Sequence, residues 1–580
     1  MGRVKQIIRE LIKKFPSWHQ WQKVPSVLTK KERYFVLGFL ILAIVSLFGW
    51  MISYNLKHTI LVPNYGGSFS EGIVGNPQYI NPILSQTNDA DRDLSELIFS
   101  GLMKYDSRGN LVADLAEKYN IGDNGKVYEF FLKKNIKWHD RAPLTADDVV
   151  FTIGAIQNPD YRSALRINWS GVEVEKVDDW TVRFKLKTPY APFLSNTTVG
   201  ILPSHIWKSI LPEKFLLAPE NLTPVGTGPY QLGKMKKDKE GFISYVELEA
   251  FGDYNTETRP FIEKIQIYFY PSEEELIKAY NRGKPDNLTL ISNQNKNLLR
   301  GVNVKSNTYR LNLPRYFSVF FNQSKSKVLS DKNVRLALNY ATNKKEIIEK
   351  ALNGEGTQVD SPIPSGTFGQ NEKIKIYEFN PEKAKEILEQ AGWKDADNDG
   401  IREKKEEKLE IELVTTELNQ LQQTAEILKE QWAKIGAKVN IIISNIGEIQ
   451  QEYIRPREYQ AILFGEVLGL DPDPYSFWHS SQKKEPGLNL ALYDNQKVDV
   501  LLKDARQVIN NDELRAKEYE QFQQLIIDDA PVVFLYSPYQ LYFTAKKIKG
   551  VEVENIVLPS KRFADIQKWY IKTQRIKKSQ

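Results

Sequence analysis

The segment from residue 115 to residue 153 constrains the fold more than any other part of the chain, because it specifies a turn, strands and a capped helix in one short stretch. Asp123-Asn124-Gly125 supplies residue types that tolerate positive φ, so a tight turn is expected there. The apolar and aromatic residues 127–132 predict a strand, and residues 136–139 alternate in a way that predicts a second one. The segment therefore predicts a hairpin.

A helix is expected directly after this hairpin. Pro143 closes the loop, and Thr145 with Asp148 three positions later has the pattern of an N-cap with an acid at N3. Val149 and Ile153 follow at helical spacing. By physics alone this is a hairpin leading into a helix, which many α/β proteins contain.

As a string, the segment resembles the hallmark of family 5 of the bacterial extracellular solute-binding proteins, which bind oligopeptides, dipeptides and nickel for ABC importers. The shared features are L-A-E, an aromatic residue, a turn, an F-x-L strand, the W-H-D step and L-T-A-x-D-V. The chain departs from the family at Arg141, where glycine is common, and at Lys133, where arginine is common. Further matches are G-T-G-P-Y at 226–230, D-x-x-V-R-x-A-L at 331–338 and A-G-W at 391–393.

The resemblance implies an α/β, two-lobed, periplasmic-binding-protein-like fold of type II, from the large cluster with an extra subdomain. Together with the residue patterns, it gives an expected division of the chain. The expected segments are a basic cytoplasmic tail (1–33), a transmembrane anchor (34–54), a linker (55–66), lobe 1 (67–305) with a strand-rich subdomain at about 111–199, lobe 2 (306–530), a return to lobe 1 (531–572) and a basic tail (573–580).

Residues 34–54 form an apolar run of 21 residues without a charge, which is long enough to span a bilayer. The 33 residues before it hold nine Lys and Arg against two Glu, so they carry more positive charge than the whole chain, whose net charge is +6. The alternative is a cleaved signal peptide, but the run is longer than a usual h-region and no A-x-A site follows. We expect an uncleaved signal anchor in the plasma membrane, with the N-terminus cytoplasmic and the main body extracellular or periplasmic.

The chain lacks the residues and motifs that several classes of protein function require. The chain has no cysteine, which excludes disulfides, thiolate metal sites, cysteine nucleophiles and a lipidated cysteine. There is no G-x-S-x-G motif, the histidines have no metal-ligand spacing, and the Gly-rich residues 225–232 lack the lysine of a P-loop. The small, mixed net charge gives no reason to expect nucleic acid. We expect a monomer that is not an enzyme and needs no cofactor.

One motif nevertheless suggests a metal. Residues 395–406 match the calcium-loop pattern D-x-D-x-D-G-x5-E position by position, and Gly400 permits its tight turn. The ligand candidates are Asp395, Asp397, Asp399 and Glu406. However, Arg402 stands where an apolar residue usually packs, and the residues that follow predict a strand rather than a helix. A structural calcium ion and a plain polar turn both remain open.

Ligand contacts are expected at loop tips that face a cleft between the lobes. The most unusual loop is 464–480, which contains two Asp-Pro steps and several aromatic residues. The candidate ligand-binding residues are Asn88, Asp89, Tyr316, Phe317, Phe320, Asn322, Arg455, Glu466, Asp471, Asp473 and Trp478. For the aromatic residues a place in the core is an equal alternative, and for Arg455 a solvated surface position is another.

In the peptide binders that the chain resembles, the loop matching 464–480 carries an aspartate that pairs with the α-ammonium group of the peptide. Alignment on Asp473-Pro474 puts Leu470 at that position, with Asp471 one residue away. The departure implies that Asp471 or Glu466 takes the role, or that the ligand is held differently.

We therefore expect a membrane-tethered solute-binding protein that captures a peptide or a similar small solute by closure of two lobes and delivers it to ABC permease subunits. A membrane-tethered receptor or sensor on the same fold is the first alternative. A membrane-bound hydrolase is the second.

Overall fold

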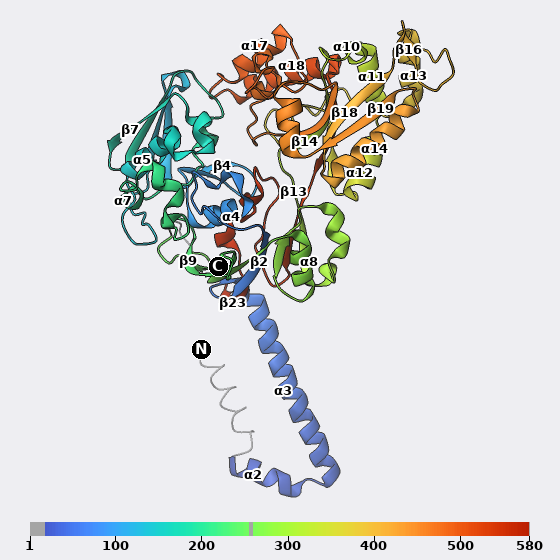
Figure 1. The fold of residues 1–580 in the computed structure, drawn as a ribbon. Coiled ribbons are helices and arrows are strands. Elements are labelled where there is room, and N and C mark those ends of the chain that lie inside the picture. Colours follow the sequence, from blue (N-terminus) through green and yellow to red (C-terminus); the bar gives the residue numbers. More distant parts are fainter. Residues whose placement is uncertain (1–17, 255–258, 579–580) are drawn as a thin grey trace, which may run out of the picture. The chain divides into compact units, whose positions relative to one another are not determined.

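The computed structural model describes residues 18–254 and 259–578 (Figure 1). The chain divides into two compact units, one made of the residues up to 64 together with those from 572 onward, and the other made of residues 65–571.

The first unit contains α2 (Trp18–Val27), α3 (Lys30–His58) and a two-stranded antiparallel sheet of β1 (Thr59–Asn64) and β23 (Lys572–Lys577). Thr29 and Glu32 form a capping box at the start of α3, which is the one described helix long and apolar enough to cross a membrane. Within the segment predicted as a linker, 55–66, α3 continues to His58 and β1 follows at once. Residues 573–577 of the predicted basic tail belong to β23.

The second unit begins with lobe 1, whose centre is a mixed seven-stranded sheet. In spatial order its strands are β13 (Ser306–Leu311), β22 (Gln540–Ala545), β12 (Asn287–Thr289), β2 (Ser68–Val74), β11 (Lys264–Tyr270), β10 (Ile243–Ala250) and β9 (Tyr230–Lys237). The longer helices of this lobe outside its subdomain are α4 (Asp89–Ile98) and α8 (Glu273–Asn281), and a short hairpin consists of β3 (Met103–Tyr105) and β4 (Leu111–Ala113).

Lobe 1 also carries a strand-rich subdomain. Its four-stranded antiparallel sheet has the order β5 (Ala116–Gly122), β6 (Val127–Leu132), β8 (Thr181–Leu186) and β7 (Val172–Asp178), and α5 (Ala146–Gln157) packs on it. The capping box predicted at Thr145 and Asp148 is confirmed, with Thr145 N donating to Asp148 Oδ2 at 2.9 Å.

The predicted hairpin partner is wrong. The turn at Asp123–Gly125 joins β6 to the preceding strand β5, whereas residues 136–139 form only one isolated bridge, between Lys137 and Pro143. Arg141, at the family's usual glycine position, has a φ of 73° and therefore carries backbone strain that glycine would not.

Lobe 2 contains a six-stranded mixed sheet covered by helices on both faces (Figure 1). The strand order is β15 (Gly356–Gln358), β21 (Val532–Pro538), β14 (Arg315–Phe321), β20 (Ala461–Val467), β18 (Glu410–Thr416) and β19 (Lys438–Ser444). One core layer involves α11 (Lys332–Tyr340), α12 (Lys344–Leu352), α13 (Pro381–Gln390) and α14 (Asn419–Ala433), and the other involves α17 (Gln496–Ala505) and α18 (Asp512–Asp529).

The pleat of β14 explains this division. Val319 and Phe321 enter the first core layer, while Tyr316 and Phe320 enter the second, as alternation along a strand requires. The predicted lobe boundaries need correction, because β13 belongs to the sheet of lobe 1 and β21 to that of lobe 2. The chain thus enters lobe 2 with β14 and leaves it after β21.

The Gly-rich stretch before β9 has a packing role. A Cβ atom on Gly226 would lie 1.9 Å from the carbonyl oxygen of Ile98, and one on Gly228 would lie 2.5 Å from the carbonyl carbon of the same residue. The two glycines let this loop lie against the C-terminal end of α4, which is also a wall of the candidate site.

Candidate functional site

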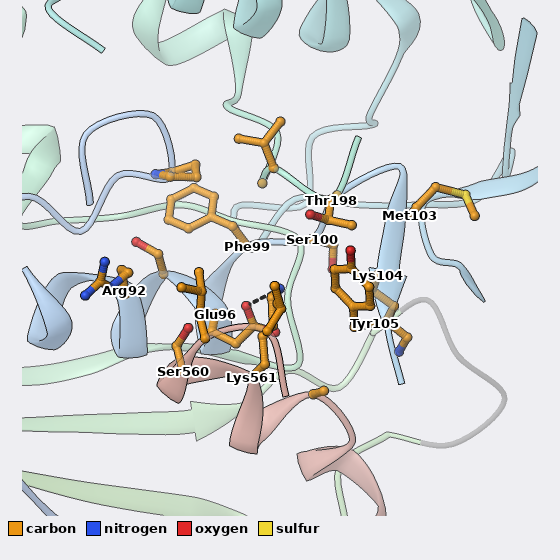
Figure 2. A pocket seen from close by; sticks show the side chains of 18 of the residues that line it. Arg92, Glu96, Phe99, Ser100, Met103, Lys104, Tyr105, Thr198, Ser560 and Lys561 are labelled. Atoms are coloured by element: carbon orange, nitrogen blue, oxygen red, sulfur yellow. Dashed lines mark hydrogen bonds and ion pairs between the residues drawn. The ribbon is translucent and has the colours of Figure 1, made fainter. Parts of the chain in front are cut away.

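A cavity of about 310 Å³ opens beside α4 in lobe 1. Its walls come from α4, the β3–β4 hairpin, the loop at 195–200 and the 3-10 helix η10 (Pro559–Phe563), together with Gly469 of lobe 2 (Figure 2). Its size suits a small ligand. Because Gly469 directly precedes Leu470, the cavity touches the loop that the sequence singled out.

Charges of both signs line this cavity. Glu96 of α4 and Lys561 of η10 form an ion pair at 2.6 Å, which Figure 2 shows as a dashed line. Lys104 and Asp114, on the two sides of the β3–β4 hairpin, approach to 4.0 Å. Arg92 adds a third cation.

Some polar atoms in the cavity wall are satisfied and others are not. Tyr105 Oη donates to Ser195 Oγ at 3.0 Å, and Arg92 Nη1 donates to the Gln86 carbonyl at 2.7 Å. Asp114 is 4% exposed, and its Oδ1 atom has no hydrogen-bond donor among the residues that the structure describes. A buried carboxylate oxygen without a donor is costly, so a ligand cation would be favourable here.

A buried ionic cluster holds the two charged walls together. Arg562 of η10 donates two hydrogen bonds to Asp93 of α4, at 2.8 and 2.6 Å, and a third to Glu71 of β2 at 3.3 Å. Tyr542 Oη donates to the same Glu71 at 3.0 Å, and burial raises the pKa of Glu71 to about 7. The bidentate pair fixes η10 against α4 and thereby positions Lys561 opposite Glu96.

The predicted lobe 1 residues lie close to the cavity without lining it. Asn88 is the N-cap of α4, with Oδ1 accepting from Ala90 N at 3.0 Å, and its Nδ2 donates to the Asn76 carbonyl at 2.8 Å. Asp89 pairs with Arg92 across one turn of α4 and is otherwise largely exposed. Both residues therefore contact the first turn of α4, and their role in ligand binding stays a prediction.

Most predicted lobe 2 residues belong to its core. Tyr316 and Phe320 are fully buried, and Phe317 is half-buried, with its ring centroid 5.6 Å from that of Tyr536. Asn322 is buried too, and its Nδ2 donates to the Arg457 carbonyl at 3.0 Å. For the aromatic residues the core alternative is the one observed.

Glu466 and Trp478 are buried in the same layer as Tyr316, whose hydroxyl donates to Glu466. Burial raises the pKa of Glu466 to about 8. Together with Arg455, Glu466 lines a second cavity of about 460 Å³ within lobe 2. Arg455 itself is exposed and lies 3.8 Å from Glu485.

The two aspartates of the unusual loop already have cationic partners. Asp471 pairs with Arg515 of α18, and burial nevertheless raises the pKa of its carboxyl. Asp473 pairs with Arg506 at 2.8 Å and accepts a hydrogen bond from Tyr190 Oη of lobe 1 at 3.2 Å. Ala191 N donates to the Arg506 carbonyl at 2.8 Å. Asp473 therefore lies at a contact between the two lobes.

The calcium motif forms a loop leading into a small hairpin of β16 (Glu403–Lys404) and β17 (Glu407–Lys408). Asp395 and Asp397 lie close enough to share an ion, but the third acid of this group is Glu403 rather than Glu406. Glu406 is in the hairpin turn, with a φ of 66°. Lys408 pairs with both Asp399 and Asp397. Glu406 lies outside the group formed by Asp395, Asp397 and Glu403, and calcium binding with its predicted ligands stays a prediction.

The charged residues that line the cavity beside α4 were not predicted. Lys561 meets Glu96 from far along the chain, and no local pattern signals such a pair. Glu96 is part of a recognisable amphipathic helix, and Lys104 and Asp114 flank a turn, but nothing in the sequence marks these charges as directed inward.

Comparison with known proteins identifies the family. The model for "Bacterial extracellular solute-binding proteins, family 5 Middle" matches residues 110–487. The chain belongs to this family. The family 5 assignment also agrees with the two-lobed α/β architecture described above.

This family 5 chain resembles the oligopeptide-binding protein AppA of Bacillus subtilis, with 32% identity over 519 residues, covering 88% of this chain and 92% of AppA. The dipeptide-binding protein of Escherichia coli is 27% identical over 525 residues, covering 83% of this chain and 91% of that protein.

Solved structures of two relatives superpose over nearly all of their length. AppA of Bacillus subtilis in complex with a nonapeptide gives a TM-score of 0.67 at 30% identity, covering 88% of this chain and 100% of that one. The ABC transporter substrate-binding protein CtaP of Listeria monocytogenes gives 0.74 at 25% identity, again covering 88% and 100%. The chain is therefore an extracellular solute-binding protein with the family's two-lobed fold.

Proposed function

We propose that this chain is the membrane-anchored solute-binding subunit of an ABC importer, and that it captures a short peptide or a similar charged solute and delivers it to a permease. The observation that carries the proposal is the cavity beside α4, in which half-buried charges of both signs and the buried Asp114 line one space in a chain of this family. The peptide ligands in the names of AppA and the dipeptide-binding protein support the same ligand class.

In this proposal the charged termini of the ligand take the place of the ion pairs that the side chains of the cavity make with one another. The α-ammonium group pairs with Asp114, whose Oδ1 lacks a donor among the described residues, and with Glu96. The α-carboxylate pairs with Lys561 and Lys104. Charge-assisted hydrogen bonds in a desolvated cavity are strong and directional, so they select zwitterionic solutes. Asp114 would then supply the carboxylate that is absent at Leu470.

Binding is coupled to closure of the lobes. A ligand shifts the open–closed equilibrium only by its differential affinity for the two states. Gly469 brings lobe 2 to the rim of a cavity built mainly from lobe 1, and the Tyr190–Asp473 hydrogen bond joins the lobes nearby. A ligand that contacts both lobes therefore favours the closed form.

The proposed location is the outer face of the plasma membrane, with α3 as a single-pass anchor and the N-terminus in the cytoplasm. The family's extracellular role and the apolar character of α3 support this arrangement. In the proposal the chain has no hydrolytic activity and acts as a monomer. A receptor on the same fold would bind the same ligands without a permease, so co-purification with permease subunits distinguishes the two roles.

The test uses the full chain in lipid nanodiscs and peptide pools of graded length. A pool present at about 100 times its Kd should stabilise the protein by about 2.7 kcal/mol, visible as a higher Tm. Asp114→Asn should remove most of this gain, whereas the exposed control Glu417→Gln should keep it. Failure of every pool to raise the Tm would contradict peptide capture, and cleavage of the peptides would support the hydrolase alternative.

A further inference from the structure

The fold brings the C-terminal end of the chain to the outer end of the apolar helix. α3 ends at His58, and β1 begins at the next residue. β23 pairs with β1 in antiparallel register, with Lys577 opposite Thr59 and Arg575 opposite Leu61. Lys578 N then donates to the His58 carbonyl at 2.9 Å. Residues more than 500 positions apart in sequence therefore meet where α3 ends.

This sheet is strongly basic. Residues 55–64 and 572–578 contain no Asp or Glu, and their cations are Lys57, Lys572, Arg575, Lys577 and Lys578. Every residue of β23 is exposed. In the part of the chain that the structure describes, none of these five cations has a carboxylate partner, and Arg575 donates only to the Thr59 hydroxyl, at 3.1 Å. The sheet thus presents unneutralised positive charge.

The same sheet also exposes apolar side chains. Ile60 and Ile576 are cross-strand partners and are 43% and 42% exposed, and Leu61 is 58% exposed. A two-stranded sheet alone is marginally stable in water and normally packs on something else. Apolar side chains among cations, directly after a helix that can cross a bilayer, are typical of a segment at the membrane interface.

We propose that the β1–β23 sheet binds the anionic phospholipid headgroups of the membrane that α3 crosses. The proposal rests on the anchor role given to α3 above. Each Lys or Arg near an anionic surface changes the bound population about fivefold at moderate salt, so the three cations of β23, with Lys578 directly after it, form an effective contact. The apolar pair Ile60–Ile576 reaches the headgroup boundary, and the C-terminal strand is thereby held at the bilayer together with the anchor.

The chain has no native cysteine, so a single introduced cysteine can be labelled with a fluorophore at a known position. The full chain with Thr573→Cys carries a fluorophore and is placed in nanodiscs of phosphatidylcholine alone or mixed with phosphatidylglycerol. Quenching by acrylamide, which is neutral, reports the exposure of the label. We expect quenching at least about twofold weaker in the anionic nanodiscs, and we expect 0.5 M NaCl to remove the difference.

Two matched sets of substitutions complete the test. Lys572→Gln, Arg575→Gln, Lys577→Gln and Lys578→Gln together should abolish the lipid dependence. Lys214→Gln, Lys236→Gln, Lys237→Gln and Lys239→Gln, which remove equally many exposed charges elsewhere, should preserve it. Equal quenching in both lipids would overturn the proposal. Loss of the chain from both kinds of nanodisc would instead overturn the anchor, and this proposal with it.

Discussion

Glu466 allows a quantitative test of how lobe 2 is built. Its carboxyl is buried beneath the Tyr316 hydroxyl, and burial raises its pKa from 4.5 to about 8. The folded state therefore keeps the proton while the unfolded chain loses it. This contribution to stability is fully present below pH 4.5 and is lost as the pH rises towards 8. Glu466→Gln keeps an acceptor for Tyr316 and cannot ionise, so it should remove this dependence.

The magnitude follows from the two pKa values. The pKa of Glu466 is 4.5 in the unfolded chain and about 8 in the folded one. Relative to low pH, the free energy of unfolding is therefore lower by about 0.8 kcal/mol at pH 5 and by about 3.3 kcal/mol at pH 7. The stability of Glu466→Gln relative to wild type should therefore increase by about 2.5 kcal/mol between pH 5 and pH 7. The exposed Glu417→Gln should show no such increase.

Hydrogen–deuterium exchange of β14 and β20 measures this difference locally, because both strands form the wall around Glu466. Comparing variant and wild type at the same pH cancels the intrinsic pH dependence of exchange. A difference that stays constant from pH 5 to pH 7 would refute the reasoning, since it would mean that the carboxyl titrates with an ordinary pKa.

Four further substitutions, one of them a control, test other parts of the molecule. Gly226→Ala places a Cβ 1.9 Å from the Ile98 carbonyl oxygen, so it should lower the free energy of unfolding by more than about 3 kcal/mol in a thermal melt. Gly154→Ala is the control, because its Cβ would lie in open space on α5. It should raise the free energy of unfolding by up to about 1 kcal/mol. Arg141→Gly should relieve the backbone strain of the positive φ and raise the free energy of unfolding by about 1 kcal/mol, which a higher Tm would report. An unchanged or lower Tm would contradict backbone strain at this position. Glu96→Gln removes the carboxylate that pairs with Lys561 in the cavity. It should raise the Kd for peptide, measured by calorimetry, at least tenfold, which corresponds to about 1.4 kcal/mol of binding free energy. An unaltered Kd would exclude Glu96 from the binding site.

The sequence was most informative where local chemistry decides the structure. The capping box at Thr145 and Asp148 is confirmed because it depends only on residues a few positions apart. The hairpin partner of β6 was misassigned because residues 136–139 alternate as a strand would, yet β5 and β8 already occupy both edges of β6.

The candidate site was harder to predict, because its charges meet through the tertiary fold. Lys561 reaches Glu96 only after η10 packs on α4, and that packing depends on the buried Arg562. Tyr316 and Phe317 lie next to each other on β14, so their side chains point to opposite faces of the sheet. Because helices cover both faces, both side chains pack within lobe 2. The basic sheet beside α3 likewise depends on pairing between the two ends of the chain.

The central claim is that the chain captures an intact solute between its lobes. Native mass spectrometry of the full chain, released from nanodiscs after exposure to a peptide mixture, tests it most directly. We expect a species heavier than the free protein by the mass of one intact short peptide, and Asp114→Asn should lose that species. Free protein alone, or peptide fragments in solution, would contradict the account.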